Sequence, residues 1–317
     1  MKRHNQILAG ILVIQIILSV VVFWPKSSAA VESALAFPDL KSDDIVALTI
    51  TDRDGNSTTL RQVTGSWVLP DADDYPAQAD KITPLLDKVV GLTTDRLVTR
   101  TDTSHRRLQV AADNFVRCVD FETADGKKHT FYLGSSPHYG ATHFRVGGQD
   151  ETYLTDGITA WDTNATASSW VDTAYLRVTQ DDVTEMTLEN GNGTFAFTKD
   201  EDGNWTMDGL AADETLNEEA VTTLLQRATT VNLVTPLGKE EEAGYGMDAP
   251  SAVVTLKTGD KTITLRVGAR DPDSNDYVVI SSESPYYVRV SEFGVKHMVE
   301  NARDDFIQAP PTPTPEG

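Results

Sequence analysis

Short stretches of alternating apolar and polar residues run along most of the chain, and each is bounded by Gly, Asp or Asn. Residues 45–51 alternate in this way, and Asp54-Gly55 gives a hairpin signal before residues 57–63. Gly65-Ser66-Trp67 then turns the chain into a third strand. The pattern predicts an antiparallel sheet in which Trp67 is a large apolar anchor of the core.

One helical pattern interrupts these strands. Apolar residues recur at helical spacing within Ala79–Gly91, at Ile82, Leu85, Leu86 and Val89. Pro84 falls in the first turns of this pattern, where it is expected to be tolerable. Further strands are expected at 115–122, 130–133, 143–146 and 152–154.

The same pattern then occurs a second time. Residues 44–69 and 182–207 align without gaps, and identical residues fall at Asp44/Asp182, Thr49/Thr187, Gly55/Gly193, Gly65/Gly203 and Trp67/Trp205. A second helix is expected over 216–231, with strands at 251–256, 262–267, 277–280 and 286–290. We therefore expect an α+β fold of two tandem repeats, residues 37–171 and 172–308, each a mostly antiparallel sheet with one main helix.

The N-terminal segment has the pattern of a membrane anchor. The apolar run from Ile7 to Trp24 makes a helix of about 27 Å, close to the ~30 Å of a bilayer core. Lys2 and Arg3 precede the run, and this basic flank favours a cytoplasmic N-terminus. The expected order is a cytoplasmic N-terminus (1–6), a transmembrane anchor (7–24) and a linker (25–36).

A cleaved signal peptide is the alternative for this segment. Ser28-Ala29-Ala30 offers small residues at a suitable cleavage spacing, although the apolar run is longer than signal peptides need. Both interpretations put the repeats outside the cytoplasm. At the other end, residues 309–317 alternate Pro and Thr and predict an extended tail.

Composition narrows the classes of partner. The chain of 317 residues is 39% hydrophobic and 24% charged, a balance typical of globular domains. Its formal net charge of −21 repels phosphate backbones, so we expect no nucleic-acid partner. The single cysteine, Cys118, cannot form an internal disulfide and is expected to face the interior.

Acidic clusters and histidines are the candidate metal ligands. Aspartates gather at residues 52–56, 200–204 and 271–276, where a hairpin or solvated loop competes with a weak cation site. The third cluster opens like an EF-hand loop but has Asp276 where that loop needs Gly. His129, His138 and His143 lie close in sequence without a cysteine, a weak basis for zinc. We expect no metal site and no cofactor.

The chain carries no signature of nucleophilic catalysis and no phosphate-binding glycine loop. Glycosidases use a pair of carboxylates, but in so acidic a chain no particular pair stands out from the other acidic residues. Trp67 and Trp205 recur at corresponding positions, where a core role competes with glycan binding. We therefore predict no catalytic residue and a protein that is not an enzyme.

The chain resembles the bacterial family named domain of unknown function 4340. The resemblance rests on three features. These are the N-terminal anchor, the sequences Gly-Ser-Trp-Val and Gly-Asn-Trp-Thr that end the first strands of each repeat, and the stretch Tyr245-Gly246-Met247-Asp248-Ala249-Pro250. In the first repeat the corresponding stretch, Arg107-Leu108-Gln109-Val110, lacks this sequence. The resemblance covers residues 37 to 308 and implies an extracytoplasmic partner of an ABC-type export system.

These observations lead to one expected function and two alternatives. We expect an interaction module at the cell membrane, single-pass, with its repeats extracytoplasmic, accessory to an ABC-type envelope transport system. A binding protein for envelope glycan or peptidoglycan is the first alternative, and an extracytoplasmic hydrolase is the second.

Overall fold

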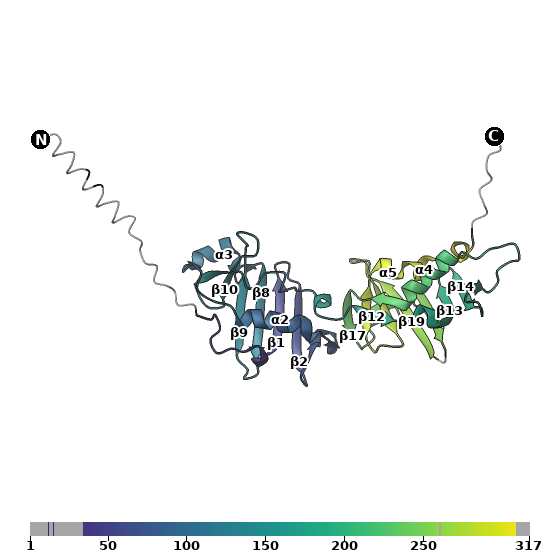
Figure 1. The fold of residues 1–317 in the computed structure, drawn as a ribbon, viewed down its shortest axis with the longest axis horizontal. Coiled ribbons are helices and arrows are strands. Elements are labelled where there is room, and N and C mark those ends of the chain that lie inside the picture. Colours follow the sequence, from purple (N-terminus) through teal and green to yellow (C-terminus); the bar gives the residue numbers. More distant parts are fainter. Residues whose placement is uncertain (1–11, 13–14, 16–33, 260, 309–317) are drawn as a thin grey trace, which may run out of the picture.

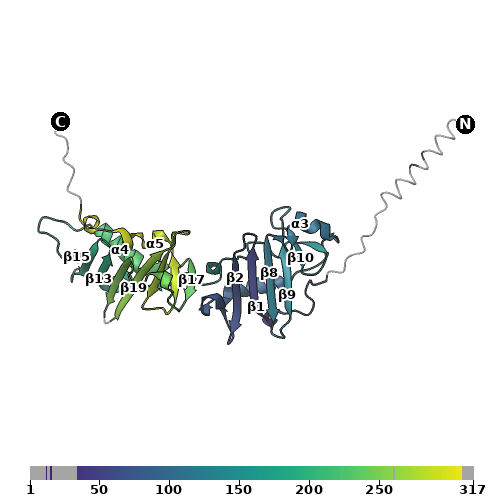
Figure 2. The same ribbon diagram turned by 180° about the vertical axis from the view of Figure 1, so that it is seen from behind.

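The computed structural model describes residues 12, 15, 34–259 and 261–308 (Figure 1). The chain forms two halves that lie side by side, and each half has a large sheet with a helix packed on it (Figures 1 and 2). All strand pairs among the described residues are antiparallel. The fold is therefore α+β, as the sequence predicts.

The first half is built on a nine-stranded sheet in the order β4-β3-β2-β1-β8-β9-β10-β11-β5. Its strands are β1 (Ile45–Asp52), β2 (Ser57–Val63), β3 (Ser66–Leu69), β4 (Tyr75–Pro76), β5 (Leu97–Thr99), β8 (Arg117–Thr123), β9 (Lys128–Leu133), β10 (Thr142–Val146) and β11 (Thr152–Thr155). A small separate ribbon pairs β6 (Val110–Ala111) with β7 (Asn114–Phe115).

The second half is built on an eight-stranded sheet in the order β15-β14-β13-β18-β19-β20-β21-β17. Its strands are β13 (Val183–Asn190), β14 (Gly193–Lys199), β15 (Trp205–Met207), β17 (Thr235–Gly238), β18 (Ala252–Thr258), β19 (Lys261–Arg270), β20 (Tyr277–Ser281) and β21 (Tyr287–Val290). A two-stranded ribbon of β12 (Ala174–Arg177) and β16 (Thr230–Asn232) accompanies it.

Each sheet buries the apolar stripe of one 12-residue helix. Helix α2 (Ala79–Val90) buries Ile82, Leu85, Leu86 and Val89, the residues that the spacing predicts. Helix α4 (Glu218–Thr229) buries Val221, Leu224, Leu225 and Ala228. Buried apolar side chains of both halves form one connected cluster, so the two cores are continuous.

The second half corrects the prediction of a single main helix per repeat. It contains α5 (Glu292–Glu300) as well as α4, and α5 packs on α4. Only Val295 and Met298 of α5 are fully buried, so its apolar pattern is too sparse to mark a helix. The helix predicted over 216–231 is also shorter, because its last residues turn into β16. The first half adds a short helix, α3 (His105–Leu108).

The central strands of the two sheets are paired in the same way. Ile45 of β1 lies opposite Thr123 of β8, and the register shifts by one residue before Ala47. Val183 of β13 lies opposite Thr258 of β18, and the register shifts before Glu185. A bulge therefore falls at the same point of each pair.

A turn that differs in sequence has the same backbone shape in both halves. Gln109 has φ 58° and Gly246 has φ 68°, so both are left-handed. The carbonyl oxygen before each of them packs against a glycine at the end of a strand: Leu108 against Gly134, and Tyr245 against Gly268. The first half thus keeps the turn although it lacks the Tyr-Gly-Met-Asp-Ala-Pro sequence.

The two halves meet through a loop of the first and an edge of the second. The Lys239 N–H donates to the Asp73 carboxylate over 2.6 Å, and the Tyr286 hydroxyl donates to the Asp74 carbonyl over 3.1 Å. The rings of Tyr75 and Tyr286 lie edge to face with centroids 4.7 Å apart. The aromatic residues at the junction are thus packed on each other.

The predicted anchor and tail lie outside the described residues. The structure describes only Leu12 and Gln15 of segment 7–24, and residues 309–317 are not described. Within the part of the chain that is described, no helix is long and apolar enough to cross a membrane.

Candidate functional site

The acidic clusters are closed turns. Asp52 accepts from the backbone N–H groups of Asp54 and Asn56, at 2.9 Å each, in the β1–β2 hairpin. Asp200 accepts from Asp202 and Asn204 in the same way, in the β14–β15 turn. Although burial acts in the opposite direction, hydrogen bonds from Asn56 hold the pKa of Asp52 below its ordinary value. These carboxylates serve their own loops, as the Asp-Gly turn chemistry predicts.

The third acidic cluster is a loop between β19 and β20. Asp271 accepts from the N–H groups of Asp273 and Ser274 and forms an ion pair of 2.7 Å with Arg289. Hydrogen bonds from Ser274 and Asp273 lower the pKa of Asp271. Across residues 34–259 and 261–308, no three His, Cys, Asp or Glu side chains are arranged to hold a metal ion.

The three histidines do not converge. His143 is buried, and its Nδ1 lies 2.7 Å from the Ser135 carbonyl oxygen. His129 stacks on Phe121 with ring centroids 4.9 Å apart, while His138 is exposed on the β9–β10 loop. Each histidine therefore has different surroundings.

The recurring tryptophans also differ. Trp67 is buried in the core, as predicted, whereas Trp205 is half-buried with the Lys199 ammonium 5.4 Å from its ring centre. Cys118 is buried, which agrees with its expected place in the interior. Burial, with Asp120 nearby, raises the pKa of its thiol to about 12, so it is protonated at neutral pH and unreactive.

Two cavities lie at corresponding ends of the two sheets. The first, of about 490 Å³, is lined by residues that include Phe37, Asp44, Thr123 and Lys127. The second, of about 390 Å³, is lined by residues that include Tyr175, Asp182, Thr258 and Lys261. Lys127 pairs with Asp125, and Lys261 pairs with Glu283. The ammonium groups of both cavities are thus already engaged within the chain.

A groove between helix α2 and the loop after β11 has a different character. Its volume is about 460 Å³, and its lining includes Asp80, Pro84, Lys88, Trp161 and Ser169. We call it the Trp161 groove. The Trp161 side chain is 91% exposed, although it carries the largest apolar surface of any residue type. An indole displayed in this way is a candidate binding element.

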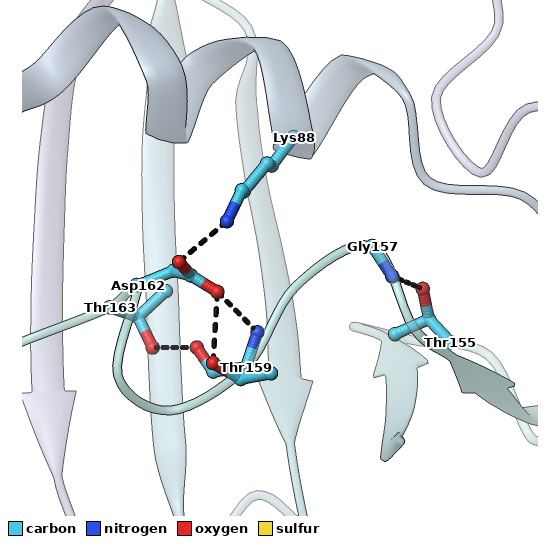
Figure 3. Close-up of polar contacts among 6 residues, drawn as sticks. All are labelled: Lys88, Thr155, Gly157, Thr159, Asp162 and Thr163. Atoms are coloured by element: carbon cyan, nitrogen blue, oxygen red, sulfur yellow. Dashed lines mark hydrogen bonds and ion pairs between the residues drawn. The ribbon is translucent and has the colours of Figure 1, made fainter. Parts of the chain in front are cut away.

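Asp162 holds the loop that presents this indole (Figure 3). One carboxylate oxygen accepts from Lys88 Nζ of helix α2 at 2.6 Å, and the other accepts from the Thr159 N–H and hydroxyl at 2.8 and 2.9 Å. The Thr163 hydroxyl donates to the Thr159 carbonyl over 3.2 Å. Although burial acts in the opposite direction, hydrogen bonds from Lys88 and Thr159 keep the pKa of Asp162 below its ordinary value.

The two ends of the loop are also fixed. Thr155 accepts from the Gly157 N–H at 3.0 Å (Figure 3), and Ile158 is fully buried. Arg117 of β8 donates to the Thr163 carbonyl over 2.7 Å. The exposed indole is therefore carried by a loop with few free torsions.

Pro84 changes the helix side of the groove. It lies within α2 and has no N–H, so the carbonyl of Asp80, four residues earlier, lacks its helical donor. Asp80 and Pro84 both line the groove. The side chains of Asp80 and Pro84 therefore meet at the groove where one helical hydrogen bond is missing.

The second half has an exposed aromatic at a related place. The Phe293 side chain, on α5, is 67% exposed and lies with its ring centre 4.1 Å from the Arg227 guanidinium of α4. We call these two residues the Phe293 surface. Arg227 and Lys88 occupy corresponding positions of α4 and α2, since each comes six residues after the first buried residue, Val221 or Ile82.

Sequence reasoning did not single out Trp161 or Phe293. Neither lies on an alternating strand or an apolar helix stripe, and exposure of a side chain cannot be read from its type. The sequence signal at each position was an aromatic residue beside an acidic one: Trp161 precedes Asp162, and Phe293 follows Glu292.

Comparison with known families gives one match. The model of a family described as "Domain of unknown function (DUF4340)" matches residues 67–234, from β3 of the first half to the residue before β17 of the second. Comparisons with curated proteins and with solved structures gave no match.

Proposed function

Since the chain belongs to the DUF4340 family, whose description assigns no activity, we propose that it is a membrane-anchored interaction module accessory to an ABC-type envelope transport system. In this proposal segment 7–24 is a single transmembrane helix with a cytoplasmic N-terminus, and both halves lie outside the cytoplasm. The module binds its partner without performing chemistry.

The proposal includes a duplication of one domain. Three features support it: the shared strand order, the bulge at the same point of β1–β8 and β13–β18, and the left-handed turn before each strand-end glycine. A further one is the N-cap of the main helix, where Gln78 donates to the Trp170 carbonyl and Asn217 to the Phe306 carbonyl. Duplication offers a long platform with two similar halves.

The observation that carries the interaction role is the Phe293 surface. Phe and Arg are enriched at protein interfaces, and an aromatic residue that is 67% exposed costs solvation free energy until a partner covers it. The Arg227 guanidinium lies over the ring and carries N–H donors that can pair with a partner. We propose that this surface contacts an integral-membrane component of the transport system.

Site-specific crosslinking in intact membranes tests the proposal. A photo-crosslinking residue at position 293 of the full chain is expected to capture an integral-membrane subunit of an ABC-type transporter. A residue at position 257, exposed on the sheet of the same half, is the matched control and should capture much less. Recovery of no integral-membrane partner at position 293 contradicts the proposal.

A second experiment tests the membrane topology. A C-terminal tag on the full chain should fractionate with membranes and be cut by protease added to cells whose outer barrier has been opened. A tag in the cytosolic fraction would reject the anchor.

A second candidate function is binding of an envelope glycan. The exposed indole of the Trp161 groove favours it, because sugar rings present flat C–H faces to aromatic side chains.

A further inference from the structure

From the geometry of the Trp161 groove we propose that it binds one or two rings of an uncharged glycan, with a sugar face against the Trp161 indole. This inference goes beyond the proposed partner, which uses the Phe293 surface of the other half. The groove volume of about 460 Å³ lies in the range of small-ligand sites.

The balance of charge in the groove favours an uncharged ligand. Its lining holds two acidic residues, Asp80 and Asp162, and two basic ones, Lys81 and Lys88. Lys88 is paired with Asp162 at 2.6 Å, and Lys81 donates to the Val171 carbonyl over 2.8 Å. An anion would meet Asp80 and a cation would meet Lys81, so a charge of either sign gains little here.

The hydrogen-bonding groups suit hydroxyls. The residues that line the groove carry donors, the Trp161 indole N–H and the Lys81 ammonium, and an acceptor, the Asp80 carboxylate. A sugar hydroxyl both donates and accepts, so it can pair with either kind of group. An apolar helix laid in the groove would cover these groups without pairing them, which costs free energy.

The rigidity of the loop favours a weak polar ligand. Asp162 and Thr163 hold the loop through hydrogen bonds to Thr159 (Figure 3). Ile158 is buried as well, so the backbone near Trp161 is fixed before any ligand arrives. Binding then needs little ordering of the protein, which improves affinity for a ligand with few apolar contacts.

Binding of two defined tetrasaccharides to the full chain tests the inference. The probes are the β-1,4-linked tetramers of N-acetylglucosamine and of glucose, which separate acetamido sugars from plain hexoses. The chain is held in phosphatidylcholine nanodiscs, because detergents with sugar headgroups would compete. Saturation-transfer NMR and calorimetry report the contact and the affinity.

We expect at least one tetramer to bind and W161A to weaken its binding at least about tenfold, which corresponds to 1.4 kcal/mol. W161F keeps an aromatic ring, so its affinity for the tetramer should lie between those of the natural chain and W161A. F293A, the matched control, removes an exposed aromatic residue of the other half and should bind as the natural chain does. Since Trp161 is 91% exposed, W161A is expected to fold, which its urea midpoint checks.

Three results would overturn the inference: no binding of either tetramer at millimolar concentration, unchanged affinity of W161A, or capture of a protein in place of a saccharide by a crosslinker at position 161. The transporter proposal is tested separately, by crosslinking at position 293. Failure at one position therefore leaves the other result intact.

Discussion

Lys239 and Asp73 join the two halves of the chain, because the Lys239 N–H donates to the Asp73 carboxylate over 2.6 Å. Asp73 has φ 52°, an uncommon backbone conformation for a residue with a side chain. Gly238 precedes Lys239, and a Cβ atom there would lie 2.6 Å from Asp73 Oδ2. A strained aspartate and a glycine thus allow a close polar contact between an η2 loop (Pro70–Ala72 and the residues after it) and β17.

Replacing Asp73 should loosen the junction. Asp73→Ala removes the charged acceptor and leaves an alanine in a left-handed conformation, so the free energy of unfolding should fall by about 1–3 kcal/mol. Asp73→Asn keeps an acceptor oxygen and tolerates the backbone, so its loss should be smaller. Urea unfolding gives the stability, and electron-spin distance measurements between one label in each half give the docking.

Asp71, an exposed residue of the same loop, provides the matched control. Asp71→Ala should leave the distance distribution narrow, while Asp73→Ala should broaden it. A distribution for Asp73→Ala as narrow as that of the natural chain would refute the role of this contact.

Gly134 and Gly268 should be intolerant of a side chain. A Cβ atom would overlap the Leu108 carbonyl oxygen at Gly134 and the Tyr245 carbonyl oxygen at Gly268. Backbone atoms cannot move aside as a flexible side chain can, so each Gly→Ala change should cost about 2–4 kcal/mol. Gly191→Ala, where a Cβ meets nothing within 4 Å, is the control. Urea midpoints compare the three variants, and an equal cost at all three would show that the packed turns are not critical.

Pro84→Ala should stabilise the chain. It restores an N–H to helix α2, which can donate to the Asp80 carbonyl, and removes the strain of a proline inside a helix. The expected gain is about 1–3 kcal/mol in the free energy of unfolding. Thr223→Ala, at the corresponding position of α4, should change stability by no more than about 0.7 kcal/mol. Thermal unfolding compares them, and a Pro84→Ala gain no larger than that of Thr223→Ala would contradict the expectation.

Acid should release the loop that carries Trp161. The pKa of Asp162 is lowered from 3.8 in the folded chain. Its stabilising contribution is therefore complete above pH 3.8 and is lost as the pH falls below that value through the folded pKa. Relaxation of the Trp161 indole ¹⁵N signal should report faster motion in this range. In the Asp162→Asn variant the Trp161 indole should be mobile at neutral pH. An indole as rigid in this variant as in the natural chain would exclude Asp162 as the residue that holds the loop.

Much of each sheet could be predicted from the sequence. The spans 45–51 and 57–63 match β1 and β2 closely, and the four predicted apolar positions of α2 are all buried. A strand or helix buried on one face must repeat its apolar residues with the period of that element, so local pattern suffices. Helix α5 escaped because it buries only two residues fully, and β17 because it is a short edge strand.

The candidate sites differ in the same respect: local sequence predicts some of them, and only tertiary contacts form the others. The acidic clusters could be recognised as turns from Asp-Gly and Asp-x-Asn alone, because their hydrogen bonds join residues two to four positions apart. The Trp161 groove joins helix α2 to a loop, and Lys88 and Asp162 are 74 positions apart. No local pattern records such a contact.

The sequence by itself determined most of the long strands, the two main helices, the α+β class and the family, because these depend on the period of apolar residues and on motifs a few residues long. The tertiary structure alone decided that Asp73 meets Lys239, that Asp162 fixes a loop on helix α2, and that Trp161 and Phe293 stay exposed. Those features arise from packing between distant segments, where which side chains are covered depends on the whole fold.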